Sequence, residues 1–226
     1  MNVFIALQQH QANLARCRRC PRMASTPVIG NPVVSRVMLV GQAPGTREAE
    51  AHKPFAWTAG KTLFKWFRES GLDEEAFRDR VYMAAVCRCF PGKNRGGGDR
   101  VPAPDEVHNC SSWLDAELAL LRPRLVIAAG KLAIQQFMPV EKLDAAVGKI
   151  HRVKRAGVTL DLLPLPHPSG ASTWIHMHPG KTLLKRALSL LARHPAWIRA
   201  CSGARKASRV TASPVRGGPA RRRSRP

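Results

Sequence analysis

The chain has 226 residues, which is enough for one ordinary domain with an appendage but short for two. Its 37 lysine and arginine residues outnumber 15 acidic residues and give a formal charge of +22, which indicates a polyanionic partner and favours nucleic acid over a membrane. No run of about 18 apolar residues could span a bilayer, and the N-terminal segment lacks the basic start of a secretory signal. We therefore expect a cytoplasmic protein with no membrane partner.

The C-terminal end of the chain differs in composition from the rest. Its last 26 residues hold eight lysine or arginine residues, no acidic residue and little apolar content. Such a segment cannot bury enough apolar surface to fold, so we predict a folded domain over residues 1–200 and a basic, disordered tail over residues 201–226. The tail accounts for only part of the positive charge, so the folded domain is itself basic.

Strand and helix patterns alternate along the chain. Short runs rich in Val, Ile and Leu predict buried strands at residues 36–40, 81–86, 124–129 and 158–165. Helical patterns occupy residues 58–70, 104–121, 131–138 and about 178–193. This alternation predicts an α/β fold, a three-layer α/β/α sandwich around a central four-stranded parallel sheet.

Two short motifs directly follow predicted strands. GQAPG occupies residues 41–45 after the first strand, and HPSG occupies residues 167–170 after the fourth. In parallel α/β folds, ligands bind beyond the carboxyl ends of the strands, where loops and helix N-termini meet. We therefore expect both motifs to border the ligand site.

Six cysteines in a reducing compartment are poor candidates for a disulfide framework, and a paired set suggests metal ligation instead. Cys17 and Cys20 form a C-x2-C pair, and Cys89 and Cys110 follow far downstream. Four thiolates suit either zinc or an iron–sulfur cluster, and the spacing does not choose between them. The alternative is that Cys87, Cys89 and Cys110 are ordinary buried thiols.

The order of the motifs along the chain is distinctive. A cysteine pair is followed by GQAPGTRE, KPFAWTAGKTLFKWF, AAVCRCFPGKNR, Cys110 and LPHPSG. Over about residues 10 to 195 this order resembles the family 4 uracil-DNA glycosylases, which carry GEAPG followed by Glu, then PF-x-G-x-x-G, NVVKCRPP, a fourth cysteine and HPS. The resemblance implies an enzyme that flips uracil out of DNA and hydrolyses its N-glycosidic bond, leaving an abasic site for base excision repair.

The same resemblance implies a cofactor and a partner. By analogy, Cys17, Cys20, Cys89 and Cys110 would bind a structural 4Fe-4S cluster, so iron becomes a better expectation than zinc. Residues 1–200 would be the catalytic domain, and we expect it to act as a monomer on DNA that contains uracil.

The resemblance also assigns the base pocket. Phe55 matches the aromatic residue on which the flipped uracil stacks, although plain core packing is the alternative. His167 matches the donor to the uracil oxygen that becomes negative as the bond breaks, although a loop histidine is more often solvated. The expected substrate-binding set is Gly41, Gln42, Ala43, Phe55, Ala85, His167 and Ser169.

Two positions depart from the family 4 pattern. Gln42 stands in place of a glutamate, and although its amide can contact the base in the catalytic site, it cannot act as a general base. Water activation therefore falls to Glu48, for which a helix N-terminal acid is the alternative reading. Ala85 stands in place of the Asn that reads the uracil edge, and its methyl group forms no hydrogen bond.

These departures define the alternatives to a uracil-DNA glycosylase of the family 4 type. Family 5 glycosylases are similar at the strand end around Ala85 and accept a wider range of damaged bases. A family 5-like enzyme for deaminated or modified bases is therefore one alternative. A non-catalytic iron–sulfur module that only binds DNA is another, from a different functional class.

Overall fold

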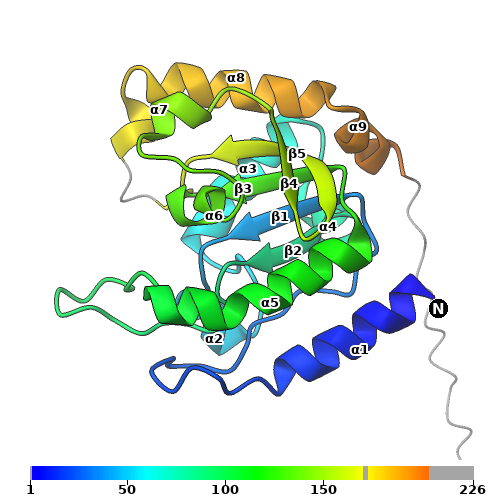
Figure 1. The fold of residues 1–226 in the computed structure, drawn as a ribbon. Coiled ribbons are helices and arrows are strands. Elements are labelled where there is room, and N and C mark those ends of the chain that lie inside the picture. Colours follow the sequence, from blue (N-terminus) through cyan, green and yellow to red (C-terminus); the bar gives the residue numbers. More distant parts are fainter. Residues whose placement is uncertain (1, 170–172, 204–226) are drawn as a thin grey trace, which may run out of the picture.

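A computed structural model of the chain describes residues 2–169 and 173–203 (Figure 1). The helices are α1 (Val3–Ala15), α2 (Thr46–Ala51), α3 (Thr58–Glu69), α4 (Glu74–Arg80), α5 (Pro104–Leu121), α6 (Lys131–Gln135), α7 (Leu143–Ala146), α8 (Gly180–Arg193) and α9 (Pro195–Ser202), with a 3-10 turn at Thr173–His176. The strands are β1 (Val37–Gly41), β2 (Tyr82–Ala85), β3 (Leu125–Ala129), β4 (His151–Arg155) and β5 (Val158–Leu165). None of these helices is long and apolar enough to cross a membrane.

The strands form one sheet in the order β2-β1-β3-β5-β4. The four predicted strands are all present and pair in parallel, which confirms the α/β class. The predicted strand number is wrong, because β4 adds a fifth strand antiparallel to β5. Its sequence, HRVKR, contains one apolar residue and therefore gives no buried-strand signal. Ala156 and Gly157, with φ of 49° and 73°, form the tight turn that joins the two strands.

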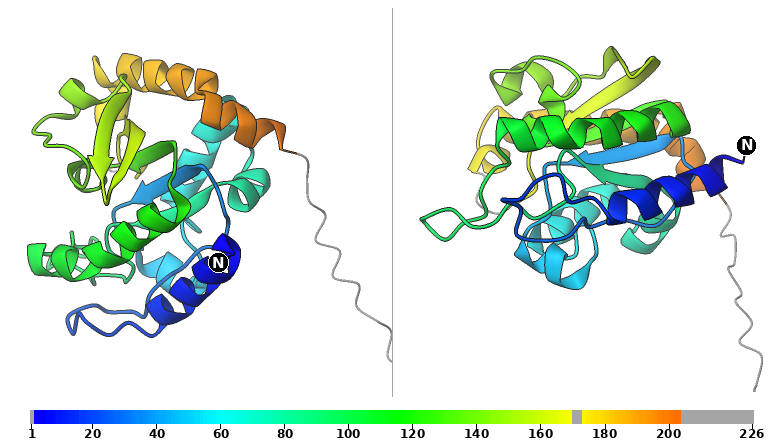
Figure 2. Two further views of the ribbon diagram at one scale, coloured as in Figure 1. Left: turned by 45° about the vertical axis from the view of Figure 1, so that its right-hand side comes forward. Right: turned by 60° about the horizontal axis from the view of Figure 1, so that its bottom comes forward.

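Helices cover both faces of the sheet, which gives the predicted three layers (Figure 2). Alternate strand residues face opposite sides: Val37 and Leu39 join one hydrophobic cluster, whereas Met38 and Val40 join the other. The first cluster packs α3, α4, α8 and α9 against the sheet, and the second packs α5 and α6. Because the parallel strands are buried on both faces, they are almost continuously apolar, and this is why the sequence predicts them.

Helix α9 extends the folded domain beyond its predicted end at residue 200. Trp197 in this helix is fully buried among aromatic residues of α3 and α4, and its indole N–H donates to Ser70 O at 2.8 Å. Cys201, predicted to lie in the tail, packs against the same cluster. The assignment of Cys201 and Ser202 to the tail was therefore wrong, because His194 caps a helix that continues to Ser202. Residues 204–226 of the predicted tail lie outside the described residues.

A buried ion pair joins the end of β2 to α5. The side chains of Arg88 and Glu117 are 2% and 0% exposed, and Arg88 Nη2 donates to Glu117 Oε2. Tyr82 donates its hydroxyl to the other carboxylate oxygen at 2.7 Å, and His10 Nε2 lies 3.3 Å from that oxygen. Burial alone would raise the pKa of Glu117, but the charge of Arg88 and these hydrogen bonds outweigh it and hold the pKa below the ordinary value.

Removing Glu117 should leave Arg88 buried without a counter-ion. We expect Glu117→Ala to lower the free energy of unfolding by about 3 to 5 kcal/mol at neutral pH, measured by urea denaturation. Because the pKa of Glu117 is lower in the folded state, the difference from wild type should be full above about pH 4.3 and shrink as the pH falls through the folded pKa.

The exposed pair Arg47–Glu50 provides the control. Glu50→Ala should cost no more than about 1 kcal/mol, because water already solvates both partners. Equal losses in the two variants would contradict the structural role of the buried pair.

Candidate active site

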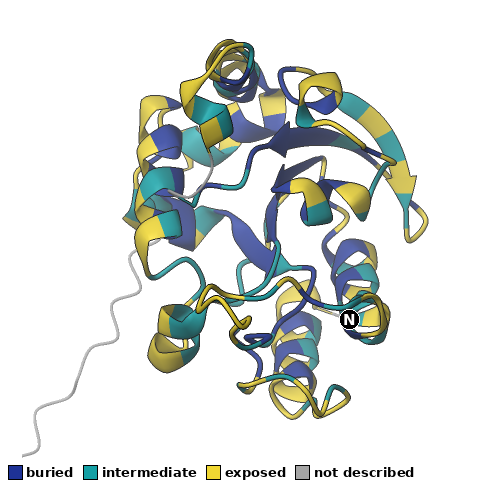
Figure 3. Ribbon diagram, turned by 90° about the vertical axis from the view of Figure 1, so that its left-hand side faces the viewer, coloured by how far each residue is buried: buried dark blue, intermediate teal, exposed yellow. Residues whose placement is uncertain are grey.

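A cleft of about 870 Å³ opens at the carboxyl ends of β1 and β5. Figure 3 faces this edge of the sheet, where the buried strands end beneath exposed loops. The cleft brings together most of the predicted site residues, namely Gly41, Gln42, Ala43, Glu48, Phe55, His167 and Ser169. The motifs at residues 41–45 and 167–170 thus border one space, as the sequence predicts, although residues 170–172 lie outside the described residues.

Ala85 lies apart from the main cleft. It lines an adjoining cavity of about 40 Å³, together with Gly41, Ala43 and Phe55, which also face the cleft. The carbonyl oxygen of Ala85 accepts a hydrogen bond of 2.9 Å from Arg88 Nε. This strand end therefore offers a methyl group and an occupied carbonyl toward the small cavity.

Phe55 is held in a conformation that a bulky residue rarely adopts. Its φ is 53°, in the left-handed region. Two glycines permit this arrangement, because a methyl group on Gly41 would lie 2.8 Å from the Phe55 ring and one on Gly60 would lie 1.9 Å from its carbonyl oxygen. Arg78 donates to the carbonyl oxygens of Pro54 and Phe55 at 3.0 and 3.2 Å. Strain fixed in this way is typical of functional residues and argues against simple core packing.

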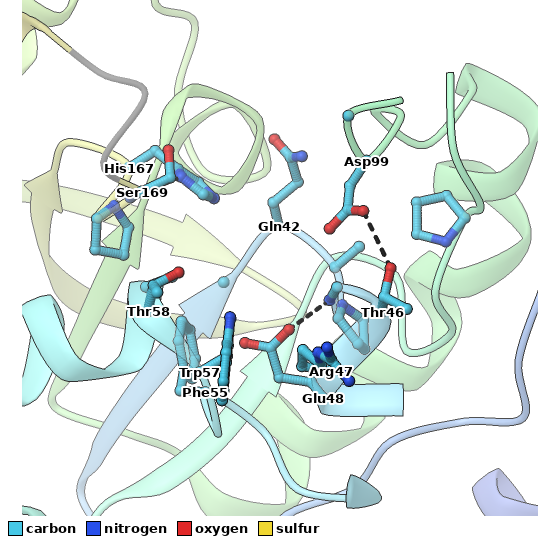
Figure 4. Close-up of a pocket in the computed structure, with 18 of the residues that line it drawn as sticks. Gln42, Thr46, Arg47, Glu48, Phe55, Trp57, Thr58, Asp99, His167 and Ser169 are labelled. Atoms are coloured by element: carbon cyan, nitrogen blue, oxygen red, sulfur yellow. Dashed lines mark hydrogen bonds between the residues drawn. The ribbon is translucent and has the colours of Figure 1, made fainter. Parts of the chain in front are cut away.

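The histidine of the second motif is fixed as a neutral donor. The backbone N–H of Ser169 donates to His167 Nδ1 at 3.3 Å, so Nδ1 carries a lone pair and the proton resides on Nε2. Burial lowers the pKa of His167, which favours the uncharged ring. Gly130, with φ of 97°, leaves room for the ring, since an added methyl group would lie 3.1 Å from His167 Cδ2. The ring therefore presents an N–H donor at the cleft (Figure 4).

Glu48 caps a helix and also lines the cleft. It lies in the first turn of α2, and its Oε2 accepts from the backbone N–H of Gly45 at 2.7 Å, as a helix-capping acid does. It also lines the cleft. Burial and the nearby charge of Asp99 raise its pKa. A carboxylate has about four acceptor positions, so the cap leaves Glu48 able to bind water.

Several residues of the cleft were missed by sequence reasoning. Asp99 reaches it from the glycine-rich loop before α5, and Figure 4 shows its carboxylate beside the GQAPG loop. Trp57 stands at the cleft with 48% of its surface exposed, and the cations of Arg47 and Lys61 each lie 5.4 Å from its ring centroid. An exposed tryptophan beside two cations is typical of surfaces that bind single-stranded nucleic acid.

The predicted cysteine set lines a second cavity of about 230 Å³. Cys17, Cys20, Cys89 and Cys110 all face it, whereas Cys87 is fully buried and does not line it. Within residues 2–169 and 173–203, no three His, Cys, Asp or Glu side chains are already arranged around a metal position. The donor set of four thiols around one cavity nevertheless fits zinc or an iron–sulfur cluster.

The fold and the cleft define an α/β domain with an open cleft at the carboxyl edge of a parallel sheet, lined by an aromatic ring and a neutral histidine donor. Residues 27–192 match the family model described as the Uracil DNA glycosylase superfamily. The chain belongs to this superfamily, which confirms the family resemblance predicted from its motifs.

Individual relatives are similar to most of the chain. The Type-4 uracil-DNA glycosylase of Pyrobaculum aerophilum is 31% identical over 172 residues, covering 72% of this chain and 83% of the relative. The Type-4 uracil-DNA glycosylase of Archaeoglobus fulgidus is 30% identical over 162 residues, covering 68% and 76%. The Type-5 uracil-DNA glycosylase of Pyrobaculum aerophilum is 32% identical over 191 residues, covering 71% and 82%.

Replacing Gly60 by alanine tests how Phe55 is positioned. In most helices this change would stabilise the protein, but here the new methyl group would lie 1.9 Å from Phe55 O. We expect Gly60→Ala to lower the free energy of unfolding by about 1 to 3 kcal/mol in urea denaturation. Gly203→Ala is the control, since its methyl group would meet no neighbour closer than 3.7 Å. Wild-type stability of Gly60→Ala would contradict the close approach described above.

Proposed function

We propose that this protein is a uracil-DNA glycosylase, a repair enzyme that flips uracil out of DNA and hydrolyses its N-glycosidic bond. The observation that carries this proposal is the neutral His167, whose Nε2–H donor shares a cleft with the aromatic ring of Phe55. The backbone of Phe55 is strained. A flipped base needs a stacking surface and hydrogen bonds to its edge, and these two side chains supply both. The names of the Type-4 relatives agree with this chemistry.

Breaking the glycosidic bond makes the uracil negative and the sugar positive, and different residues of the cleft act on the two parts. Uracil stacks on Phe55, and as the bond between C1′ and N1 breaks, the electron pair leaves with the base. The Nε2–H of His167 stabilises the negative charge that develops on the uracil oxygen. The sugar becomes positive at C1′, and Glu48 takes a proton from the water that attacks it. Gly41, Gln42, Ala43 and Ser169 complete the pocket, with the Gln42 amide as a hydrogen-bonding group toward the base.

A broader substrate range is the second candidate function. Ala85 lines a small cavity beside the cleft, and its methyl group gives no hydrogen bond to the edge of a base. The chain is also 32% identical to a Type-5 relative. Strict uracil excision needs an edge contact that Ala85 cannot provide. A panel of DNA duplexes with uracil or with deaminated purines separates the two functions, because only the broader enzyme would excise the deaminated purines.

The DNA partner follows from the charge of the chain. The formal charge of +22 favours binding to phosphates, and the basic residues 204–226, which follow α9, would add contacts to those of the catalytic domain. Arg47, Trp57 and Lys61 would meet the DNA backbone at the cleft. We propose a monomer that acts in the cytoplasm, with the catalytic domain formed by residues 1–200 and extended to Ser202 by α9.

The second cavity would hold a 4Fe-4S cluster through Cys17, Cys20, Cys89 and Cys110. Such a cluster supplies cross-links between distant parts of the chain. Here it would join the segment after α1, the loop after β2 and the middle of α5, because its ligands come from all three. Zinc is the less favoured occupant.

Metal analysis tests the cluster and its ligands. Purified protein should be brown and contain about four iron atoms per chain. Cys89→Ala should lose iron, whereas Cys87→Ala should retain most of it, because the Cys87 thiol does not line the cavity. A colourless protein with stoichiometric zinc would refute the iron assignment. Equal iron loss in both variants would overturn the choice of ligands.

Single-turnover excision from DNA with one uracil tests the function itself. We expect His167→Ala to slow the chemical step by roughly 100-fold or more, because one preorganised donor to a developing anion contributes about 2.7 to 4 kcal/mol. Affinity for an uncleavable uracil analogue should change little, since phosphate contacts dominate binding. Glu48→Gln should also slow the step, because it keeps the shape of the side chain and removes the base.

Two results would count against this assignment. A near-wild-type rate for His167→Ala would show that another group stabilises the departing uracil. Absence of uracil excision by the wild-type protein would overturn the proposed function altogether.

A further inference from the structure

The cleft contains a second carboxylate that the proposed mechanism does not use. Asp99 lies in the loop between β2 and α5, and it contacts Lys93 Nζ at 2.7 Å and Thr46 Oγ1 at 3.4 Å. Both contacts involve Oδ1. The other oxygen, Oδ2, is turned toward Gly45, whose backbone N–H donates a hydrogen bond to Glu48.

The carboxylates of Asp99 and Glu48 lie close together. A methyl group on Gly45 would be 2.7 Å from Asp99 Oδ2 and also 2.7 Å from Glu48 Oε2. The two oxygens are therefore no more than twice that distance apart, a gap that one water molecule can bridge. Figure 4 shows both carboxylates turned toward the same part of the cleft.

The loop that carries Asp99 is anchored at its base. Arg100, the next residue, forms a bidentate ion pair with Glu106, with both hydrogen bonds at 2.7 Å. The Glu106 side chain is almost completely buried. Lys93 and Asp99 face each other across the loop as a β-bridge as well as an ion pair. Asp99 is therefore held beside Glu48 by contacts on both sides of the loop.

The other polar groups of the cleft are less suited than Asp99 to hold a water molecule together with Glu48. Gln42 is neutral, and Glu50 is exposed and paired with Arg47 at 2.9 Å. The charged groups that line the cleft with Glu48 and Asp99 are Arg47, Glu50, Lys93 and Arg100, and the neutral His167 is the remaining titratable group. Among these groups and Asp99, Asp99 is the one whose charge raises the pKa of Glu48.

We propose, on the basis of the function proposed above, that Asp99 is a second catalytic carboxylate, whose Oδ2 holds the attacking water together with Glu48. The water oxygen forms a bond to C1′ as the bond from C1′ to N1 breaks, and the electron pair of that bond leaves with uracil. The proton of the water passes to Glu48. The negative charge of Asp99 also stabilises the positive sugar.

The test is Asp99→Asn, which keeps the size of the side chain and removes its charge. We expect single-turnover excision of uracil to slow by about 10-fold or more, because a misplaced water reacts poorly. The pH profile gives a second readout. Glu48 must be ionised to accept the proton, so the rate rises as the pH increases through its pKa. Loss of the neighbouring negative charge lowers that pKa, and the acidic limb should move to lower pH.

Asp105→Asn is the matched control. It makes the same chemical change at an exposed residue of α5 that pairs with Arg22 at 2.7 Å outside the cleft. Its excision rate and pH profile should equal those of the wild type.

The outcomes separate this inference from the proposed function. A slower Asp99→Asn enzyme with a shifted acidic limb supports the role of Asp99. A wild-type rate, or a slower rate with an unmoved acidic limb, overturns that role while active wild-type enzyme leaves the proposed function standing. Wild-type protein that excises no uracil overturns the proposed function, and the inference with it.

Discussion

A buried arginine has to be neutralised, and the pairing of Arg88 with Glu117 organises the centre of this molecule. The pair ties the end of β2 to α5, while Tyr82 and His10 extend its hydrogen bonds to the start of β2 and to α1. Arg88 also forms part of the wall of the small cavity beside the cleft and part of the wall of the cysteine cavity. A single desolvated charge thus lies in the walls of both cavities, and its pairing with Glu117 keeps it from being buried without a counter-ion.

The shape of the cleft depends on glycines, which have no side chain. Gly41 and Gly60 let the Phe55 ring and carbonyl approach the backbone, and Gly130 makes space for His167. The aromatic ring and the histidine lie in loops, and they pack against glycines in β1, at the start of α3 and just after β3. Such preorganisation is what a site needs if it is to stabilise charge that exists only during the reaction.

The sequence predicted the parts of the fold that depend on local pattern. The run 158–165 coincides with β5, and 104–121 coincides with α5, which begins with a proline and a capping glutamate. It missed β4, whose pairing comes from a turn and a neighbouring strand rather than from apolar residues. In the site, the motifs led to His167 and Phe55, but Asp99 could not be found, because contacts of Arg100 and Lys93 within its irregular loop bring it to the cleft. Contacts of this kind leave no periodic trace in a sequence.

The position of β4 at the border of the sheet has a further consequence. One side of this strand has no neighbour among the described strands, so its backbone groups could pair with a strand of another molecule. Arg152 and Lys154 alternate along it as exposed cations. A second copy arriving edge to edge would bring like charges together, which disfavours strand-to-strand aggregation of the protein.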